Sequence, residues 1–329
     1  MAAVEEIQIQ RIVADGDLDG LLSAAILKRV WVGAEVQFSH PAEIRRGDLD
    51  EFIDGLTAVV DLPFHPNCGL HIDHHLTNKL TEAQLIEAEA RGCKIIWDSA
   101  LSAARVCYDT FREIVDLSDI GQWMEMVDKL DGGKISREEF LSNHPIVWIG
   151  RIMDASDIEL CTMLLTEITD GIAPDELINI EAVSNKVRVA KDEFSRLKSM
   201  IDSCSEVVDR MAILRLDGKG VRTNGYLITA HFGERCDACI IIHGDVAPRK
   251  EQWPLSASFY SNSFLHKSGG LFDLTVLATA FDKDGGGHAN ACGCRIQPLS
   301  ESGEVENREV EVDDIERNLE TWIHTWGNR

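Results

Sequence analysis

Short apolar runs alternate with longer segments of helical periodicity over the first 115 or so residues. Three of these runs, at residues 9–14, 57–60 and 69–72, are bounded by turn-forming residues. Runs of this length are typical of buried parallel strands, and strands that alternate with helical segments form βαβ units. The sequence therefore predicts an α/β fold whose first domain is a doubly wound parallel sheet.

The rest of the chain shows a different pattern. Residues from about 119 to 170 are mostly helical, and 175–210 form an amphipathic connector helix or helix pair. Strand-like runs then occur at residues 211–216, 225–230, 238–244, 255–261 and 292–296. Because 329 residues exceed what one core usually supports, we expect two domains. The expected parts are a first domain at 1–172, a helical linker at 173–205, a smaller mixed α/β domain at 206–300, and a charged C-terminal tail with a short helix at 301–329.

Acidic clusters follow the three apolar runs of the first domain. They are Asp15, Asp17 and Asp19 after the first run, Asp61 after the second, and Asp73-His74-His75 after the third. Asp is also a common turn and N-cap residue, but all three clusters lie at strand ends, where open α/β sheets place their ligands. Crowded carboxylates repel unless cations neutralise them, and oxygen ligands with imidazole suit Mn²⁺ or a similar ion. A pair of divalent metal ions is therefore predicted here.

Four motifs together resemble the DHH phosphoesterase family with its associated C-terminal substrate domain. They are DGDLDG at 15–20, the Asp of VVD at 59–61, DHH at 73–75 and GGGHANACG at 285–293. The resemblance implies a phosphohydrolase that uses two Mn²⁺ ions, with Mg²⁺ or Co²⁺ as substitutes. It implies metal ligands at Asp15, Asp17, Asp19, Asp61 and His74, with Asp61 bridging both ions. It also implies that His75 faces the substrate phosphate and that Asp61, His74 and His75 are catalytic. Asp73 would orient an imidazole from behind the ligands, and a loop of Gly285, Gly286, Gly287 and His288 would grip the substrate phosphate.

Two ligand positions stay open. Some members use a His four positions ahead of the Asp-x-Asp pair, where this chain has Val13, so Asp15 either replaces that ligand or lies beside the metals. The final carboxylate is Asp128 or Asp131, which share a helix face; the glycines after Asp131 mark a helix end and slightly favour it. Asp98 is predicted to be the N-cap of the next helix instead.

The second domain lacks the strand arginine that often assists in nanoRNases, because the corresponding run reads SASFYSNS. Arg295 or Lys267 could compensate, although a solvated surface role is the commoner use of such residues. Cys236, Cys239, Cys292 and Cys294 could be proposed as a zinc site, but their spacing is unusual and buried free thiols are the preferred interpretation.

Composition narrows the substrate and the compartment. The net charge of -24 argues against a large binding surface for long nucleic acid, because binding to many backbone phosphates requires an excess of Lys and Arg. An odd number of cysteines, nine, suits a reducing compartment, and no signal peptide or membrane-spanning run is evident, so we expect a cytoplasmic protein. A homodimer is compatible with the sequence.

The expected function is hydrolysis of phosphoester bonds in short oligonucleotides or small nucleotides, which would release nucleoside monophosphates as an oligoribonuclease does. One alternative is an exopolyphosphatase or pyrophosphatase, which would use the same metals without a base pocket. Another is a nucleotide-sensing module without turnover.

Overall fold

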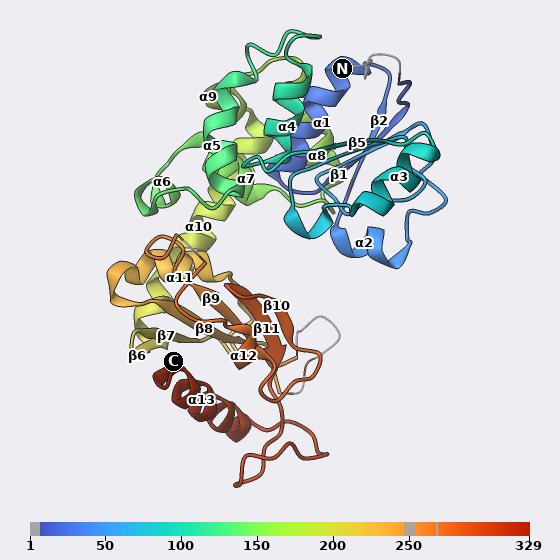
Figure 1. The fold of residues 1–329 in the computed structure, drawn as a ribbon. Helices are drawn as coiled ribbons and strands as arrows, with labels where there is room; N and C mark the ends of the chain where they lie inside the picture. The colour runs from blue at the N-terminus through green and yellow to red at the C-terminus, as the bar shows by residue number, and fades with distance from the viewer. Residues whose placement is uncertain (1–6, 247, 249–253, 268) are drawn as a thin grey trace. The chain divides into compact units, whose positions relative to one another are not determined.

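The computed structural model describes residues 7–246, 248, 254–267 and 269–329 (Figure 1). These residues divide into two compact units. The N-terminal unit comprises the described residues up to 135 together with 142–191, and the C-terminal unit comprises 136–141 and 192–329. Helix α10 (Glu181–Cys204) begins in the first unit and ends in the second.

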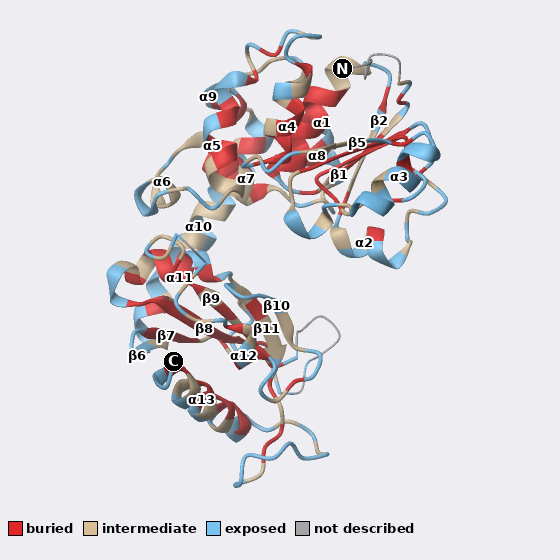
Figure 2. Cartoon of the chain, viewed as in Figure 1, coloured by how far each residue is buried: buried red, intermediate tan, exposed pale blue. Residues whose placement is uncertain are grey.

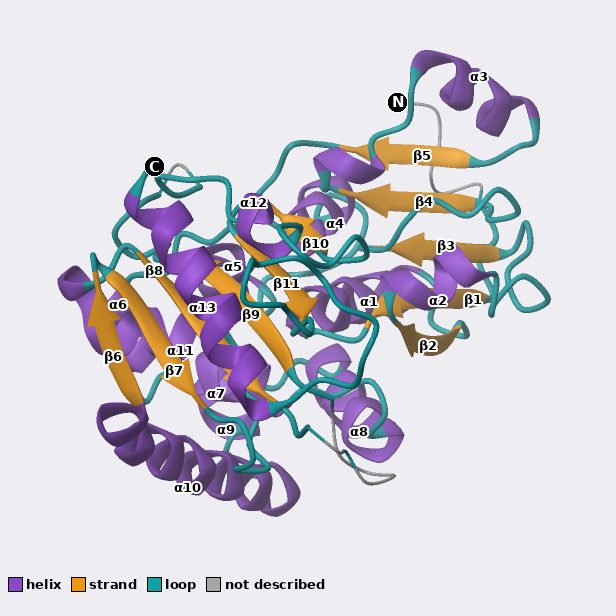
Figure 3. Cartoon of the chain, turned by 90° about the horizontal axis from the view of Figure 1, so that it is seen from below, coloured by secondary structure: helices purple, strands orange, loops and turns teal. Residues whose placement is uncertain are grey.

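A five-stranded parallel sheet forms the centre of the N-terminal unit, in the order β2-β1-β3-β4-β5 (Figure 3). Its strands are β1 (Arg11–Asp15), β2 (Glu35–Ser39), β3 (Thr57–Val60), β4 (Leu70–Asp73) and β5 (Lys94–Trp97). The central strand β3 is buried along its whole length, as its unbroken apolar run predicts. The chain moves outward from β1 to β2 and then returns to β3, so the winding direction reverses between β1 and β3.

Helices cover both faces of this sheet, which confirms the doubly wound prediction. On one face, Ile44 of α2 (Pro41–Arg46) and Ala88 of α3 (Glu82–Ala90) pack with Val13 and Val59. On the other face, α1 (Leu18–Val30) packs against α4 (Ala103–Phe111), and Figure 2 shows α1 buried along much of its length. The remaining helices of the unit are η2 (Leu76–Asn78), α5 (Gly121–Asp131), α7 (Pro145–Ile152), α8 (Ile158–Thr169) and α9 (Pro174–Leu177).

The start of α4 corrects one prediction. Asp98 is not its N-cap, because the helix begins later along the chain. Ser102 occupies that position, and its side chain accepts a hydrogen bond of 3.0 Å from the N–H of Arg105.

A six-stranded mixed sheet forms the centre of the C-terminal unit, in the order β10-β11-β9-β8-β7-β6. The strands are β6 (Ser205–Val208), β7 (Met211–Arg215), β8 (Ala238–His243), β9 (Ser256–Ser261), β10 (Gly286–His288) and β11 (Ala291–Arg295). Strands β7 and β8 are parallel and the other neighbours are antiparallel. The mixed sheet predicted from the apolar runs is therefore confirmed.

One of those runs was assigned to the wrong element. Residues 225–230 belong to helix α11 (Gly225–Phe232), whose N-cap Asn224 accepts a hydrogen bond of 3.1 Å from the N–H of Tyr226. An apolar run of this length does not by itself distinguish a strand from a buried helix.

Helices pack on both faces of the second sheet too. Leu197 of α10 and Ile228 of α11 pack with Ile241 on one face. The other face is covered by α12 (Thr275–Ala278) and by α13 (Val312–Gly327), whose Trp322 packs at right angles against the ring of Phe259. The segment expected as a charged tail therefore ends in a helix that forms part of this unit's core. Across the described part of the chain, the helices are all too short or too polar to span a bilayer.

Candidate metal centre

The acidic clusters of the N-terminal unit meet at one edge of its sheet. Asp15 is the last residue of β1, Asp61 follows β3, and Asp73 is the last residue of β4. Parallel strands all present their carboxyl ends at the same edge, and this edge is where the winding direction reverses. The sheet therefore brings together residues that lie up to 58 positions apart in the chain.

The glycines of DGDLDG allow this first loop to fold tightly. A side chain at Gly16 would overlap Ala155, and one at Gly20 would overlap the backbone of Asp15. Asp17 is the N-cap of α1 and accepts a hydrogen bond of 3.0 Å from the N–H of Gly20. The capping role and a position at the metal centre thus coexist in Asp17.

Asp19 links α1 to α4. Its two carboxylate oxygens accept hydrogen bonds of 2.7 Å each from the N–H groups of Ala103 and Ala104, at the N-terminus of α4. The side chain is buried, so this helix end partly compensates a carboxylate that solvent does not reach.

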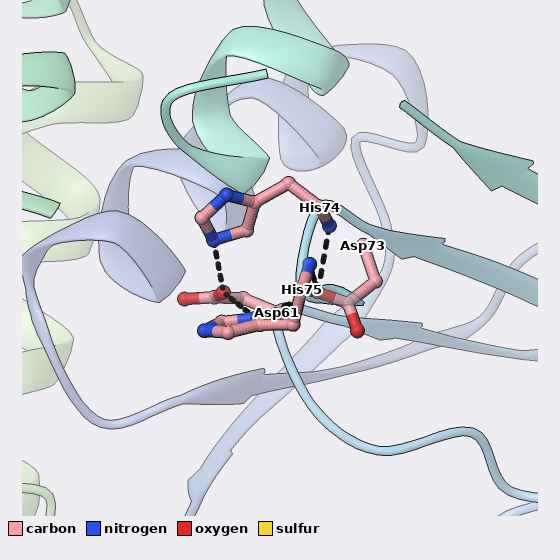
Figure 4. Close-up of side chains that lie close together, drawn as sticks. All are labelled: Asp61, Asp73, His74 and His75. Atoms are coloured by element: carbon pink, nitrogen blue, oxygen red, sulfur yellow. Dashed lines mark hydrogen bonds and ion pairs between the residues drawn. The ribbon is translucent and has the colours of Figure 1, made fainter. Parts of the chain in front are cut away.

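Asp61 occupies the centre of the cluster in a strained conformation. Its φ is 60°, a left-handed value that non-glycine residues seldom adopt. The side chain is 2% exposed, and its Oδ1 has no hydrogen-bond partner. That oxygen lies 3.7 Å from Nε2 of His74 and 3.6 Å from Nδ1 of His75 (Figure 4). A buried oxygen without a donor, held by a strained backbone, is suited to a cation.

His74 is oriented as a metal-binding imidazole would be. Its Nδ1 lies 3.2 Å from the carbonyl oxygen of Ala100, which only accepts, so Nδ1 carries the proton. Nε2 then faces the acids, with Oδ2 of Asp131 at 3.1 Å and Oδ2 of Asp19 at 3.7 Å. A backbone carbonyl that fixes the far nitrogen of the ring is a common arrangement behind ligating histidines.

Asp73 holds the neighbouring imidazole. Its Oδ1 lies 2.9 Å from Nδ1 of His75 and accepts from the N–H groups of His74 and His75 at 2.7 and 3.1 Å. Asn78 donates to its other oxygen at 2.7 Å. Burial raises the pKa of Asp73, but these hydrogen bonds outweigh it and hold the pKa below its usual value. Figure 4 shows His74 and His75 on the same side of the strand end, with Asp61 beside both.

The pKa values of the other acids show how crowded the cluster is. Burial, followed by repulsion from neighbouring carboxylates, raises the pKa of Asp19 and of Asp61 well above the usual value. Part of Asp17 is exposed to solvent, but protein atoms surround its carboxylate closely. This burial, followed by repulsion from the charge of Asp15, raises the pKa of Asp17 to about 6. Burial also raises the pKa of Asp15. The acids therefore favour protons or cations over the fully ionised, empty state.

The donor atoms fit divalent cations. Among the described residues, three groups each bring one donor atom per residue within 4.8 Å of the others. They are Asp15, Asp17 and Asp61; Asp19, His74 and Asp131; and Asp61, Asp73, His74 and His75. Asp61 belongs to two of the groups, and His74 also belongs to two, so the groups adjoin one another.

The structure places Asp128 and Asp131 differently. Asp128 accepts hydrogen bonds from Ser102 at 2.7 Å and from Nη2 of Arg105 at 2.6 Å, and so is paired within the protein. Asp131, the last residue of α5, faces His74. Of these two residues, Asp131 alone belongs to one of the candidate metal-binding groups found among the described residues.

His40 was not identified from the sequence. It follows β2, and its Nδ1 lies 3.5 Å from Oδ1 of Asp15. The strand-end rule that selected the other acids applies to the run at 35–39 as well, and it would have included this residue.

The GGGH motif lies in the C-terminal unit and forms a strand. We expected residues 285–288 to be a loop, but Gly286–His288 is the edge strand β10, paired with β11 in a hairpin. Gly287 has a φ of 136°, and a side chain there would crowd the backbone of β11. His288 is exposed. The glycines here therefore permit close pairing of β10 with β11.

Two further expectations for this unit concern charge and thiols. Arg295 is bound by Asp282 and Asp284, each at 2.6 Å, and Lys267 is exposed. Cys236, Cys239 and Cys292 are buried and Cys294 is half-buried. Cysteine is absent from the candidate metal groups of the described residues.

The fold that carries these residues is also found in known protein structures. No protein-family model and no curated protein matches the chain. Among solved structures, a pGpG-specific phosphodiesterase from Vibrio cholerae is 23% identical, with a TM-score of 0.74, over 97% of this chain and 99% of that one. The DHH domain of a member of the s1p family of ribosomal proteins is 13% identical, with a TM-score of 0.59, over 97% of this chain and 87% of that one. The chain has the DHH phosphoesterase fold.

The exonuclease RecJ bound to manganese has the same fold over 99% of this chain and 92% of that one, at 12% identity and a TM-score of 0.50. The resemblance inferred from the four motifs is thus confirmed at the level of the fold, with both units included. Identities this low show the architecture and not the activity.

Proposed function

We propose that this chain is a DHH-family phosphohydrolase that uses two divalent metal ions to cleave short oligonucleotides or small nucleotide phosphoesters. The observation that carries the proposal is Asp61, a buried and strained carboxylate that belongs to two candidate ligand groups and has an oxygen without a hydrogen-bond donor. A nucleotide-sensing module would not need such a residue, since a shared carboxylate serves to hold two ions at a fixed spacing.

Each residue has a proposed duty. Asp15, Asp17 and Asp61 would hold one ion, and Asp19, His74 and Asp131 would hold the other. Asp61 would be shared, because its Oδ1 lies 3.7 Å from Nε2 of His74. Carboxylates with one imidazole suit Mn²⁺, and Mg²⁺ or Co²⁺ would be substitutes. Such ions, when bound, would lower the pKa of water so that hydroxide is available to attack phosphorus, and would neutralise charge on the phosphoryl oxygens.

The chain's own residues would position the substrate. Asp73 fixes the His75 ring through Nδ1, which leaves Nε2 available to a phosphate oxygen. His288, exposed on β10, would contact a phosphate of the substrate from the C-terminal unit. Asp128 has no direct duty in this proposal, because Arg105 and Ser102 already occupy its carboxylate.

A short substrate and a nucleoside monophosphate product remain the preferred form of the proposal. The net charge of -24 disfavours a long nucleic-acid footprint. The structural neighbour described as a pGpG-specific phosphodiesterase adds that dinucleotide to the substrates to be tested.

The test is a substrate panel with the purified chain. Dinucleotides including pGpG, longer oligonucleotides, phosphoadenosine phosphate, cyclic dinucleotides, polyphosphate and pyrophosphate would be incubated with Mn²⁺, with Mg²⁺ or with EDTA. Metal-dependent release of nucleoside monophosphates supports the proposal. Turnover of polyphosphate or pyrophosphate alone would support the phosphoanhydride alternative, and binding without turnover would support the sensing module.

A further inference from the structure

One buried polar side chain of the N-terminal unit has no part in the proposed metal centre. His71 lies on β4 and is 1% exposed. The centroid of its ring is 5.5 Å from that of Phe64, which packs against the apolar core beneath α2 and α3. Among the described residues, Nδ1 of His71 has no hydrogen-bond partner. A polar atom buried in this way costs free energy that an apolar side chain would not, so what the ring contributes is the bond made by its other nitrogen.

That other nitrogen, Nε2, binds the backbone next to Asp61. It lies 2.9 Å from the carbonyl oxygen of Leu62. A carbonyl oxygen only accepts, so Nε2 carries a proton and donates it, whether the ring is neutral or charged. Leu62 directly follows Asp61 in the chain, and its side chain is fully buried. The bond therefore fixes the residue that comes after the strained carboxylate.

The hydrogen bonds between the backbones of β3 and β4 end at Asp61. The N–H of Asp61 donates to the carbonyl oxygen of Ile72 at 3.0 Å. The two N–H groups that follow β4 donate to the side chain of Asp73 instead. The chain bends at Asp61, where φ is 60°. The carbonyl of Leu62 thus lies beyond the ladder, and a side chain supplies its donor.

These two bonds hold Asp61 from both sides. A non-glycine residue keeps a left-handed φ only where the surrounding structure restrains it. Ile72 accepts from the N–H of Asp61 itself, and His71 donates to the carbonyl that follows. Both restraints come from adjacent residues of β4, which lies beside β3 in the sheet (Figure 3). The same strand ends in Asp73, which holds the ring of His75, so β4 positions both groups.

We propose that His71 is a positioning residue of the metal centre. Its hydrogen bond to Leu62 holds Asp61 in the left-handed conformation in which the carboxylate is shared between two ions. His71 is not among the candidate ligands of the described residues, so it acts through the backbone. This inference rests on the proposed function for the pair of ions. Without the bond, the carboxylate common to both ions would move, while His75 and His288 would still meet the substrate.

Two amide variants of similar chemistry separate the donor from the bulk of the side chain. Gln places its amide nitrogen about where Nε2 of a histidine lies, and Asn places its amide nitrogen about where Nδ1 lies. His71→Gln should therefore keep the bond to Leu62, and His71→Asn should lose it. His71→Phe, which keeps a ring without a donor, is a second test of the same loss. Cys93→Ala is the matched control, because it removes a buried atom from the core of the same unit and leaves the donor in place.

The decisive measurement is the binding of Mn²⁺ to the full-length protein. Calorimetry gives the affinity, and the EPR spectrum shows whether two bound ions are close enough to be exchange-coupled. His71→Asn and His71→Phe should bind the pair about ten- to a hundredfold more weakly, as is usual when a group that orients a ligand is lost, and the coupled signal should disappear. For hydrolysis of pGpG, kcat should fall by a similar factor while KM changes little. His71→Gln and Cys93→Ala should match the wild type in all three measurements.

The outcomes distinguish this inference from the proposed function. It is overturned if a folded donor-free variant binds the Mn²⁺ pair as tightly as the wild type does, if His71→Gln is as weak as His71→Asn, or if Cys93→Ala weakens binding equally. Thermal melting in EDTA shows which variants are folded, and if one donor-free variant is not, the other is compared with His71→Gln. If the variants bind Mn²⁺ as expected but the wild type hydrolyses no phosphoester, the proposed function fails and the role of His71 stands. A wild type that binds no pair of ions would overturn both.

Discussion

Substitution of Asp61 by Asn is the sharpest perturbation of the metal centre. Asn keeps the shape of the side chain and tolerates the left-handed φ of 60° found here, so the backbone is not the cause of any effect. Loss of the shared carboxylate should lower turnover at least about a thousandfold, which corresponds to about 4 kcal/mol of transition-state stabilisation.

The same substitution should not destabilise the metal-free protein. Burial, followed by repulsion from Asp19 and Asp17, raises the pKa of Asp61, so an uncharged amide removes an unfavourable charge from the metal-free protein. A ligand at 100 times its Kd stabilises a protein by about 2.7 kcal/mol, and the wild type should show a gain of that order with Mn²⁺. In Asp61→Asn most of this gain should disappear.

The assay combines thermal melting in EDTA and in Mn²⁺ with hydrolysis of a dinucleotide. Asp128→Asn is the matched control, since it removes a charge that Arg105 and Ser102 already bind. It should lower stability by about 1 to 3 kcal/mol, as weakened hydrogen bonds to a charged group do, in both conditions, while the gain from Mn²⁺ persists. Near-normal turnover of Asp61→Asn with saturating metal, or an equal loss of metal response in both variants, would refute the two-ion assignment.

Three further outcomes are expected. The pKa values of Asp17, Asp19 and Asp61 are raised, so these acids bind protons more tightly in the folded protein than in the unfolded chain. In EDTA, their contribution to the free energy of unfolding is therefore full below about pH 4. It is lost as the pH rises through the pKa values of the folded protein, which is about 6 for Asp17. Mn²⁺ should therefore raise Tm more at about pH 7.5 than at about pH 5.5; equal shifts in melting scans would contradict this. His288→Ala should lower kcat/KM on dinucleotides about ten- to a hundredfold, yet leave Mn²⁺ affinity by calorimetry and hydrolysis of a small activated ester unchanged. Activity should peak on oligomers of a few nucleotides with a weak salt dependence, and fast degradation of long strands with a steep salt slope would argue against a small substrate site.

Strand ends were the most informative feature of the sequence. The rule that ligands gather beyond the carboxyl ends of parallel strands brought Asp15, Asp61 and Asp73 together correctly, because the order of apolar runs determines which edge each residue reaches. The same rule applies to His40, which follows β2 and whose Nδ1 lies 3.5 Å from Oδ1 of Asp15.

Other features depend on partners that no local pattern reveals. Asp128 and Asp131 share a helix face by spacing, and what separates them is that α4 offers Arg105 and Ser102 to one while His74 faces the other. The apolar run at 225–230 predicts a strand as readily as a buried helix. The cap at Asn224 and the packing over β8 and β9 define the helix.

The hydrogen bonds between Asp19 and the start of α4 have a consequence for the whole N-terminal unit. One carboxylate both faces the candidate metal centre and accepts the two N–H groups that begin α4. An ion that fixes Asp19 must stabilise the contact between α1 and α4. Because such coupling is reciprocal, a weaker contact between the two helices must in turn lower the affinity for the ion. Substitutions of side chains buried between these two helices, with no atom near a metal, should then change the metal affinity.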